Sequence, residues 1–246
     1  MSRSRLIALF ALAAAAVLAT AALRMRPPGP LPDFPRLVLW AWEMPERLTF
    51  IDPHTAAVAF LARTIRWRAA GLDSRPRLQP LSIPPGAALI AVVRLESAGG
   101  QLPDAEVVAA DAVRAASLPG VRALQVDFDA RRSERDWYRD LLGRIREKLP
   151  PAMPLQITAL ASWCQGDRWM PGLPVAEAIP MLFRMGAGER FDGADFREPL
   201  CRASLGLDPA ELPVALPHGR RIYLFYSHPW TAESYRAALH LASKLQ

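Results

Sequence analysis

The sequence predicts an α/β protein, an irregular barrel of strands in which some helices are short or missing. Apolar runs of strand length recur along the chain, amphipathic helices follow only some of them, and polar residues stand where several of them end. An open doubly wound sheet is the alternative. That fold commonly carries a Gly-rich phosphate loop after its first strand, where this chain has Trp-Ala-Trp-Glu43. No internal repeat is found.

The composition fits one domain of barrel size, which we place at residues 36–246. The chain has 246 residues, of which 51% are hydrophobic and 22% charged, with a net charge of +6. Only Lys148 and Lys244 among its 30 basic residues are lysines, an arginine excess typical of a GC-rich bacterial genome. Acidic residues interrupt the arginines, as at 131–136, which argues against a nucleic-acid partner.

Residues 1–23 are predicted to be a signal peptide or a membrane anchor. Arg3 and Arg5 precede an apolar run over 6–23, long for a signal-peptide core and just short of a membrane span. Small residues near Ala21 favour cleavage; the alternative is an uncleaved inner-membrane anchor. No cysteine follows the run, which excludes a lipoprotein anchor. We therefore expect an exported, periplasmic protein, soluble or anchored by this segment.

If the protein is exported, its two cysteines reach an oxidising compartment, where disulfides form. In an oxidising compartment Cys164 and Cys201 could form a disulfide that closes a loop of roughly 37 residues. The alternative is two separate thiols. No Cys-His pattern accompanies either residue, so a catalytic cysteine is not expected.

The first part of the barrel follows a Pro-rich linker over 24–35. Apolar runs at 37–42 and 56–61 are predicted strands. A hairpin excursion is predicted next, with arms at 64–68 and 77–83 around turn-forming residues.

The middle of the chain alternates strands and helices. A strand at 87–96 precedes a helix that begins after Asp104 and ends before Pro119. A second strand, 121–129, precedes the clearest amphipathic helix, at 133–149.

The last part contains strands at 155–161, 178–185 and 222–226, with a weaker one near 201–205 and a final helix after Thr231. Helices thus follow the third, fourth and last of the well-marked strands. This order predicts an irregular TIM-like (β/α) barrel with a hairpin excursion.

The strand at 121–129 carries two carboxylates on one face. Because side chains alternate along a strand, Gln125, Asp127 and Asp129 share the face opposite Leu124 and Val126. In a barrel this face is the interior, and residues at the carboxyl ends of parallel strands meet at one mouth.

Other strand ends supply the remaining candidate residues of this mouth. Carboxylates beside aromatic rings suit a poly- or oligosaccharide, because indole rings pack on the apolar faces of sugars and acids reach the glycosidic oxygen. The candidate catalytic residues are Asp127, Asp129, Glu96 and Glu43, and the candidate binding residues are Trp40, Trp42, Arg94, Thr158, Ser162, Trp163, Arg184, Tyr226 and Trp230.

Asp127 and Asp129 are too close along one strand to act on opposite sides of a bond. We expect one to work as general acid with Glu96, or failing that with Glu43, while the other orients it. The structural alternatives are a pair of aspartates that binds loop amides, an Arg94–Glu96 ion pair, and tryptophans that belong to the core.

Several chemistries are not expected. The four histidines, His54, His218, His228 and His240, are scattered without ligand spacing, which argues against a His-based metal hydrolase. Gly-x-Ser-x-Gly is missing, which removes the usual serine hydrolase. The residues predict neither a metal site nor a cofactor.

Taken together, short segments along nearly the whole chain after the leader resemble a bacterial family of unknown function, the one numbered 3142 among such domains. The resemblance implies no established activity. Its segments are 38–43, 58–61, 78–81, 90–96, 125–130, 133–134, 157–164, 180–186 and 222–225.

A more distant resemblance is to chitinase-type glycosidase barrels, whose fourth strand ends in Asp-x-x-Asp-x-Asp-x-Glu. Asp127 and Asp129 match the inner two acids, but Leu124 stands at the first acid and Arg131 at the catalytic glutamate. Two functions therefore remain: a glycoside hydrolase-like enzyme, or a non-catalytic barrel that binds a glycan or another partner at the cell envelope.

Overall fold

The computed structural model describes residues 31, 33–186 and 191–246. The predicted leader and most of the Pro-rich linker lie outside these residues. In the part of the chain that is described, no helix is both long and apolar enough to cross a membrane.

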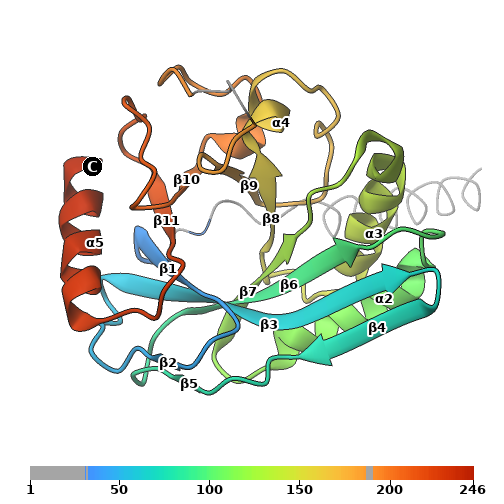
Figure 1. The fold of residues 1–246 in the computed structure, drawn as a ribbon, viewed down its shortest axis with the longest axis horizontal. Helices are drawn as coiled ribbons and strands as arrows, with labels where there is room; N and C mark the ends of the chain where they lie inside the picture. Colours follow the sequence, from blue (N-terminus) through green and yellow to red (C-terminus); the bar gives the residue numbers. More distant parts are fainter. Residues whose placement is uncertain (1–30, 32, 187–190) are drawn as a thin grey trace, which may run out of the picture.

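Parallel strands form a closed barrel, which confirms the predicted fold class (Figure 1). β1 pairs with β11 on one side and with β3 on the other, so the sheet has no open edge at this point and is not a doubly wound sheet. The eight strands, in order around the barrel from β1, are β1 (Leu37–Ala41), β11 (Arg221–Phe225), β10 (Ser204–Leu207), β9 (Glu177–Met181), β8 (Leu155–Leu160), β7 (Val121–Asp127), β6 (Leu89–Ser97) and β3 (Ala56–Arg68).

Well-formed helices follow β6, β7 and β11, in the predicted places. α2 (Ala105–Ala112) continues as the 3₁₀ helix η1 (Val113–Ser117), and α3 (Arg135–Lys148) follows the 3₁₀ turn η2 (Arg132–Glu134). Figure 1 shows α2 and α3 on one side of the barrel and α5 (Ala232–Lys244) on the other, beside β11. Between β8 and β10 the described chain has only two helical elements, the short α4 (Ala161–Gln165) and the 3₁₀ turn η3 (Pro199–Cys201).

The hairpin excursion exists. Its first predicted arm, 64–68, is confirmed, but its second, 77–83, is wrong. β3 runs without a break to Arg68, with a bulge between Leu61 and Arg63, and β4 (Gly71–Pro76) returns antiparallel to it. β4 is an exposed edge strand, so it lacks the apolar alternation that marks a strand and its composition is that of a turn. The predicted second arm contains only β5 (Leu81–Ser82), which pairs with β2 (Glu46–Arg47).

Several strands end earlier than predicted. β7 ends at Asp127, so Asp129 lies in the connection beyond it, and β9 ends at Met181. The next strand, β10, begins at Ser204. After β7 and β9 the alternation of the sequence therefore continues beyond the strand, into the connection that follows it.

The barrel interior is mainly apolar but contains one buried ionisable cluster. Glu177 accepts hydrogen bonds from Gln156 Nε2 at 2.6 Å, Tyr223 Oη at 3.0 Å and Ser204 Oγ at 2.9 Å, and Arg221 Nη1 lies 3.5 Å from its carboxylate. Burial raises the pKa of Glu177, although Arg221 and these donors oppose the shift. The cluster therefore satisfies a carboxyl group that the fold places inside the barrel.

The strand pairing with the fewest paired residues in the barrel is that between β9 and β10. These strands pair at one position, Gly206 opposite Met181, and Pro180 in β9 has no N–H to offer a neighbour. A Cβ at Gly206 would lie 3.1 Å from both the Phe225 ring and the carbonyl oxygen of Pro180. Glycine is needed here because the two strands and the Phe225 ring approach so closely.

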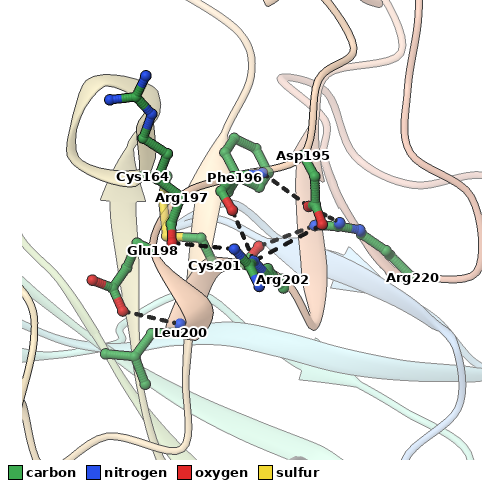
Figure 2. The surroundings of a disulfide bond; sticks show 9 residues. All are labelled: Cys164, Asp195, Phe196, Arg197, Glu198, Leu200, Cys201, Arg202 and Arg220. Carbon is green, nitrogen blue, oxygen red and sulfur yellow. Dashed lines mark hydrogen bonds and ion pairs between the residues drawn. A yellow bond between two sulfur atoms is a disulfide. The ribbon is translucent and has the colours of Figure 1, made fainter. Parts of the chain in front are cut away.

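A disulfide links the connections that follow β8 and β9. Cys164 in α4 and Cys201 in η3 are fully buried and bonded, with their Cα atoms 5.8 Å apart. Figure 2 shows that Arg220 and Asp195 form an ion pair beside the disulfide. Because the bond joins α4 to the segment before β10, it closes a loop that contains the whole of β9.

We expect the Cys164→Ala/Cys201→Ala double variant to lose about 3 to 4 kcal/mol of unfolding free energy, since the bond closes a loop of 37 residues. Urea denaturation of the oxidised wild type, the reduced wild type and the double variant measures the loss. The reduced wild type should unfold at nearly the same urea concentration as the variant. Equal midpoints for the oxidised and reduced wild type would contradict the bond.

Candidate functional site

A cavity of about 320 Å³ opens at the carboxyl ends of the barrel strands. This is the end at which barrels of this class carry their sites. Polar, charged and aromatic side chains from several strands meet there. The lining residues are Trp42, Arg94, Asp127, Asp129, Leu160, Ala161, Ser162, Met181, Phe183, Arg184, Met185, Gly186 and Phe225.

Asp127 is the buried carboxylate of this cavity, with 7% of its surface exposed. Thr158 Oγ1 donates a hydrogen bond of 2.7 Å to it, and Arg94 Nη1 lies 3.3 Å from its other oxygen. The three residues come from adjacent strands, with Arg94 opposite Asp127 in the pairing of β6 with β7. Burial raises the pKa of Asp127, although Arg94 and Thr158 oppose the shift.

Asp129 lies at the rim of the cavity and is exposed. Partial burial raises the pKa of its carboxyl group, and the charge of Arg94 lowers it. Asp127 and Asp129 therefore line the same cavity, although Asp129 lies beyond the end of β7.

Glu96 does not line the cavity. Its carboxylate accepts hydrogen bonds from Arg94 Nε at 2.9 Å and from Arg66 Nε at 2.6 Å. Burial raises the pKa of Glu96, but the two arginines outweigh it and the net pKa is lowered. The residue lies instead in an adjoining depression, beside Asp127 and Asp129. The ion pair weighed from the sequence is therefore present, and it holds Glu96 in its charged form.

Glu43 is also outside the cavity. It accepts a hydrogen bond of 2.8 Å from the backbone N–H of Leu78, and Arg75 lies 3.5 Å from it. These contacts hold the segment that follows β4 against the end of β1. Glu43 thus has a structural role in this arrangement.

Aromatic rings form one wall of the cavity. Trp42, Phe183 and Phe225 line it, and Trp40 is fully buried behind them with its ring 4.3 Å from that of Phe225. The guanidinium carbon of Arg94 lies 5.5 Å from the centroid of the Trp42 ring. Trp42 is therefore the tryptophan that can meet a ligand, and Trp40 supports the wall.

Three predicted binding residues lie elsewhere. Trp163 is buried against Trp169 because Ala161 begins a helix at the end of β8 and turns the next residues away from the mouth. Trp230 is buried and donates a hydrogen bond of 2.9 Å from Nε1 to the carbonyl oxygen of Trp40. Tyr226 packs beside Trp230 in a separate groove next to α5.

The cavity also has residues that were not predicted. Met181 and Phe183 alternate along the end of β9 and its continuation, and Phe225 occupies the same face as Tyr223 in β11. Alternation within these two predicted strands was the signal that could have found them. Met185 continues the same alternation within the predicted strand 178–185, whereas Gly186 lies beyond that strand and carries no such signal.

Glu46 is another buried carboxylate, and it is not part of the site. It accepts a hydrogen bond of 3.1 Å from the backbone N–H of Trp230. Burial raises its pKa, against the effects of that N–H and of Arg77. Arg77 in turn donates to the carbonyl oxygens of Trp42 and Met44, each at 2.6 Å. Glu46 and Arg77 thus fix the connection after β1.

The described residues contain no group of three or more His, Cys, Asp or Glu side chains that could hold a metal ion. The chemistry of the cavity is that of carboxylates, two arginines, a hydroxyl group and aromatic rings.

Fold and cavity together define an α/β barrel with a strand-end site. No family model matches the chain, and no curated protein matches it. Among solved structures, the spore cortex-lytic enzyme SleL of Bacillus cereus is similar over 71% of this chain, at 14% identity and a TM-score of 0.44. The similarity covers 51% of SleL, so this chain spans about half its length. Membership of family 3142 stays a prediction.

Asp127→Asn should change how stability depends on pH. Because the folded protein holds a proton on Asp127 more tightly than the unfolded chain does, the wild type should lose stability relative to the variant as pH rises from about 4. The loss ends once pH passes the pKa of Asp127 in the folded protein. The total loss of stability is about 1.4 kcal/mol for each tenfold difference in the proton affinity of Asp127 between the folded and the unfolded protein.

Urea denaturation of both proteins between pH 4 and pH 8 measures this difference. Asp73→Asn, at an exposed position of β4, is the control for removal of an aspartate. A wild-type stability that rises with pH relative to Asp127→Asn would contradict the raised pKa.

Proposed function

We propose that the barrel binds a poly- or oligosaccharide in the cavity at its strand ends. The observation that carries this proposal is the combination of an aromatic wall with a buried, hydrogen-bonded carboxylate in one opening. Sugar rings present apolar C–H faces, which pack on aromatic rings, and hydroxyl groups, which need donors and acceptors. Trp42 supplies the ring, and Asp127, Asp129 and Ser162 supply polar partners.

The cavity supports binding better than hydrolysis. Glycoside hydrolysis commonly uses two carboxyl groups that flank the bond. Asp127 and Asp129 are the only acids of the described chain that line the cavity, and they stand two residues apart. Glu96 is paired with two arginines, and Glu43 is engaged by Arg75 and the backbone of Leu78. A non-catalytic glycan-binding barrel is therefore the function that we put first.

One observation favours a second candidate, a glycoside hydrolase-like enzyme. A general acid must hold its proton near neutral pH, and burial raises the pKa of Asp127 in that direction. In this mechanism Asp127 protonates the glycosidic oxygen, and Asp129 orients it or the substrate. Arg131, at the position of the catalytic glutamate in chitinase-type barrels, donates its backbone N–H to Glu134 and supplies no acid.

We also propose that the protein works outside the cytoplasm, at the cell envelope, either soluble in the periplasm or anchored to the inner membrane by residues 1–23. A buried disulfide supports this proposal, since structural disulfides persist in oxidising compartments. The apolar leader supports it independently.

A panel of envelope and extracellular polysaccharides, tested with the wild type and Asp127→Asn, separates the two functions. We expect saturable binding without reducing-end release, and about tenfold weaker binding by the variant because an amide replaces the carboxyl group that meets the sugar hydroxyl groups. Release of product by the wild type that disappears in Asp127→Asn would establish the hydrolase instead. Release that persists in the variant would contradict Asp127 as the acid, and failure to bind any glycan would contradict both functions.

Trp42→Ala should also weaken glycan binding by about tenfold, because the variant loses the aromatic platform. Tyr226→Ala is a matched control, an aromatic residue at a strand end that lies outside the cavity. Isothermal titration calorimetry measures both variants. An equal loss in the two variants would place the sugar in the groove beside α5 or show a general loss of structure, which circular dichroism distinguishes.

A further inference from the structure

Arg184 has an unusual backbone for its residue type. Its φ is +50°, and it is the one residue other than glycine in the described chain with a positive φ. Side chains with a Cβ are disfavoured in this left-handed region, where glycine or asparagine is the usual choice. Such strain persists where the surrounding structure fixes it, and it concentrates at functional sites.

The surrounding structure fixes this conformation through Glu211. The backbone N–H of Arg184 donates a hydrogen bond of 3.0 Å to Glu211 Oε2. Glu211 itself is held by the turn after β10, where its N–H donates to the carbonyl oxygen of Asp208 at 3.0 Å. The carboxylate of Glu211 therefore holds the backbone of Arg184 and forms no ion pair with its guanidinium group.

The two arginines of the cavity differ in their partners. Arg94 is shared between Asp127 and Glu96. Arg184 lines the same cavity, is exposed, and has no carboxylate of the described residues within ion-pairing distance. Among the described residues, the cavity thus combines an arginine that is paired with carboxylates and an arginine at its rim that is not.

We propose that Arg184 binds a carboxylate of the ligand, so that the site takes a glycan that carries carboxyl groups. This inference rests on the proposed function and narrows it to a substrate class. A guanidinium group matches a carboxylate with two parallel hydrogen bonds, a geometry that a neutral sugar does not require. The carboxyl group could belong to a uronic acid or to a lactyl ether substituent of an amino sugar.

The other charges of the cavity are compatible with an acidic ligand. Burial raises the pKa values of Asp127 and Asp129, which favours their neutral forms and lessens repulsion of a second carboxylate. Glu96, the strongly ionised acid nearby, is neutralised by Arg66 and Arg94 and lies outside the cavity.

The test compares acidic oligosaccharides with matched neutral ones. One pair is an oligogalacturonate and its carboxyl-reduced form; the other is an oligosaccharide that contains muramic acid and a chitin oligosaccharide of equal length. The full chain is titrated with each by calorimetry. We expect the wild type to bind the acidic member of at least one pair about tenfold more tightly, and the pair concerned identifies the source of the carboxylate.

Two substitutions of the same residue separate charge from backbone strain. Arg184→Gln removes the charge and keeps a side chain in the left-handed region, and Arg184→Gly removes both. We expect the acidic-to-neutral preference to fall to about one in both variants, while only Arg184→Gly raises the melting temperature, by roughly 2–4 °C. Arg197→Gln, at an exposed arginine away from the cavity, should keep the preference.

The outcomes are distinguishable. Equal wild-type affinity for both members of each pair overturns this inference and leaves glycan binding intact. A preference that survives in Arg184→Gln also overturns it, because another residue then recognises the carboxylate. Binding of no oligosaccharide overturns the proposed function itself and this inference with it.

Discussion

The pairing of β1 with both β3 and β11 is the constraint on which the rest of the structure depends. β1 has five residues, all buried, and every one of them is paired with a neighbouring strand. Once the ring is closed, its interior is finite and the carboxyl ends of parallel strands open at one mouth. Arg94, Asp127 and Thr158 meet because β6, β7 and β8 are consecutive members of this ring.

The ring of strands has its least extensive pairing between β9 and β10, where a single residue pair joins the two strands. Two features compensate for this. Gly206 leaves room for the Phe225 ring and for the backbone of Pro180, so the strands approach closely despite the missing N–H of proline. The Cys164–Cys201 bond ties the connection after β8 to the segment before β10, so β9 lies within a covalently closed loop. Part of the cavity wall, including Phe183 and Arg184, belongs to that loop.

The sequence predicted those strands and helices in which the spacing of apolar residues matches the face that the element buries. The alternation that places Asp127 opposite Val126 and the helical spacing of α3 hold in the structure. β4 was missed because an exposed edge strand needs no apolar face, and Trp163 was misplaced because the turn from β8 into α4 changes the period within one residue. Arg184 was predicted at the mouth from its strand, yet its left-handed backbone and the hydrogen bond that its N–H donates to Glu211 depend on a loop distant in sequence.

The charged residues around Asp127 are linked through shared ion pairs, and this linkage bears on the choice between the two proposed functions. Arg66 and Arg94 both pair with Glu96, and Arg94 also reaches Asp127 at a longer distance. The two arginines therefore neutralise Glu96 more fully than Asp127. Asp127 lies deeper, is incompletely neutralised and has a raised pKa. For Glu96 to serve as the second catalytic carboxylate it would have to leave two arginines, and Arg94 would then pair with Asp127 alone. That exchange would lower the pKa of the proposed acid as it freed the proposed partner, so the two roles oppose each other and the arrangement favours a binding site.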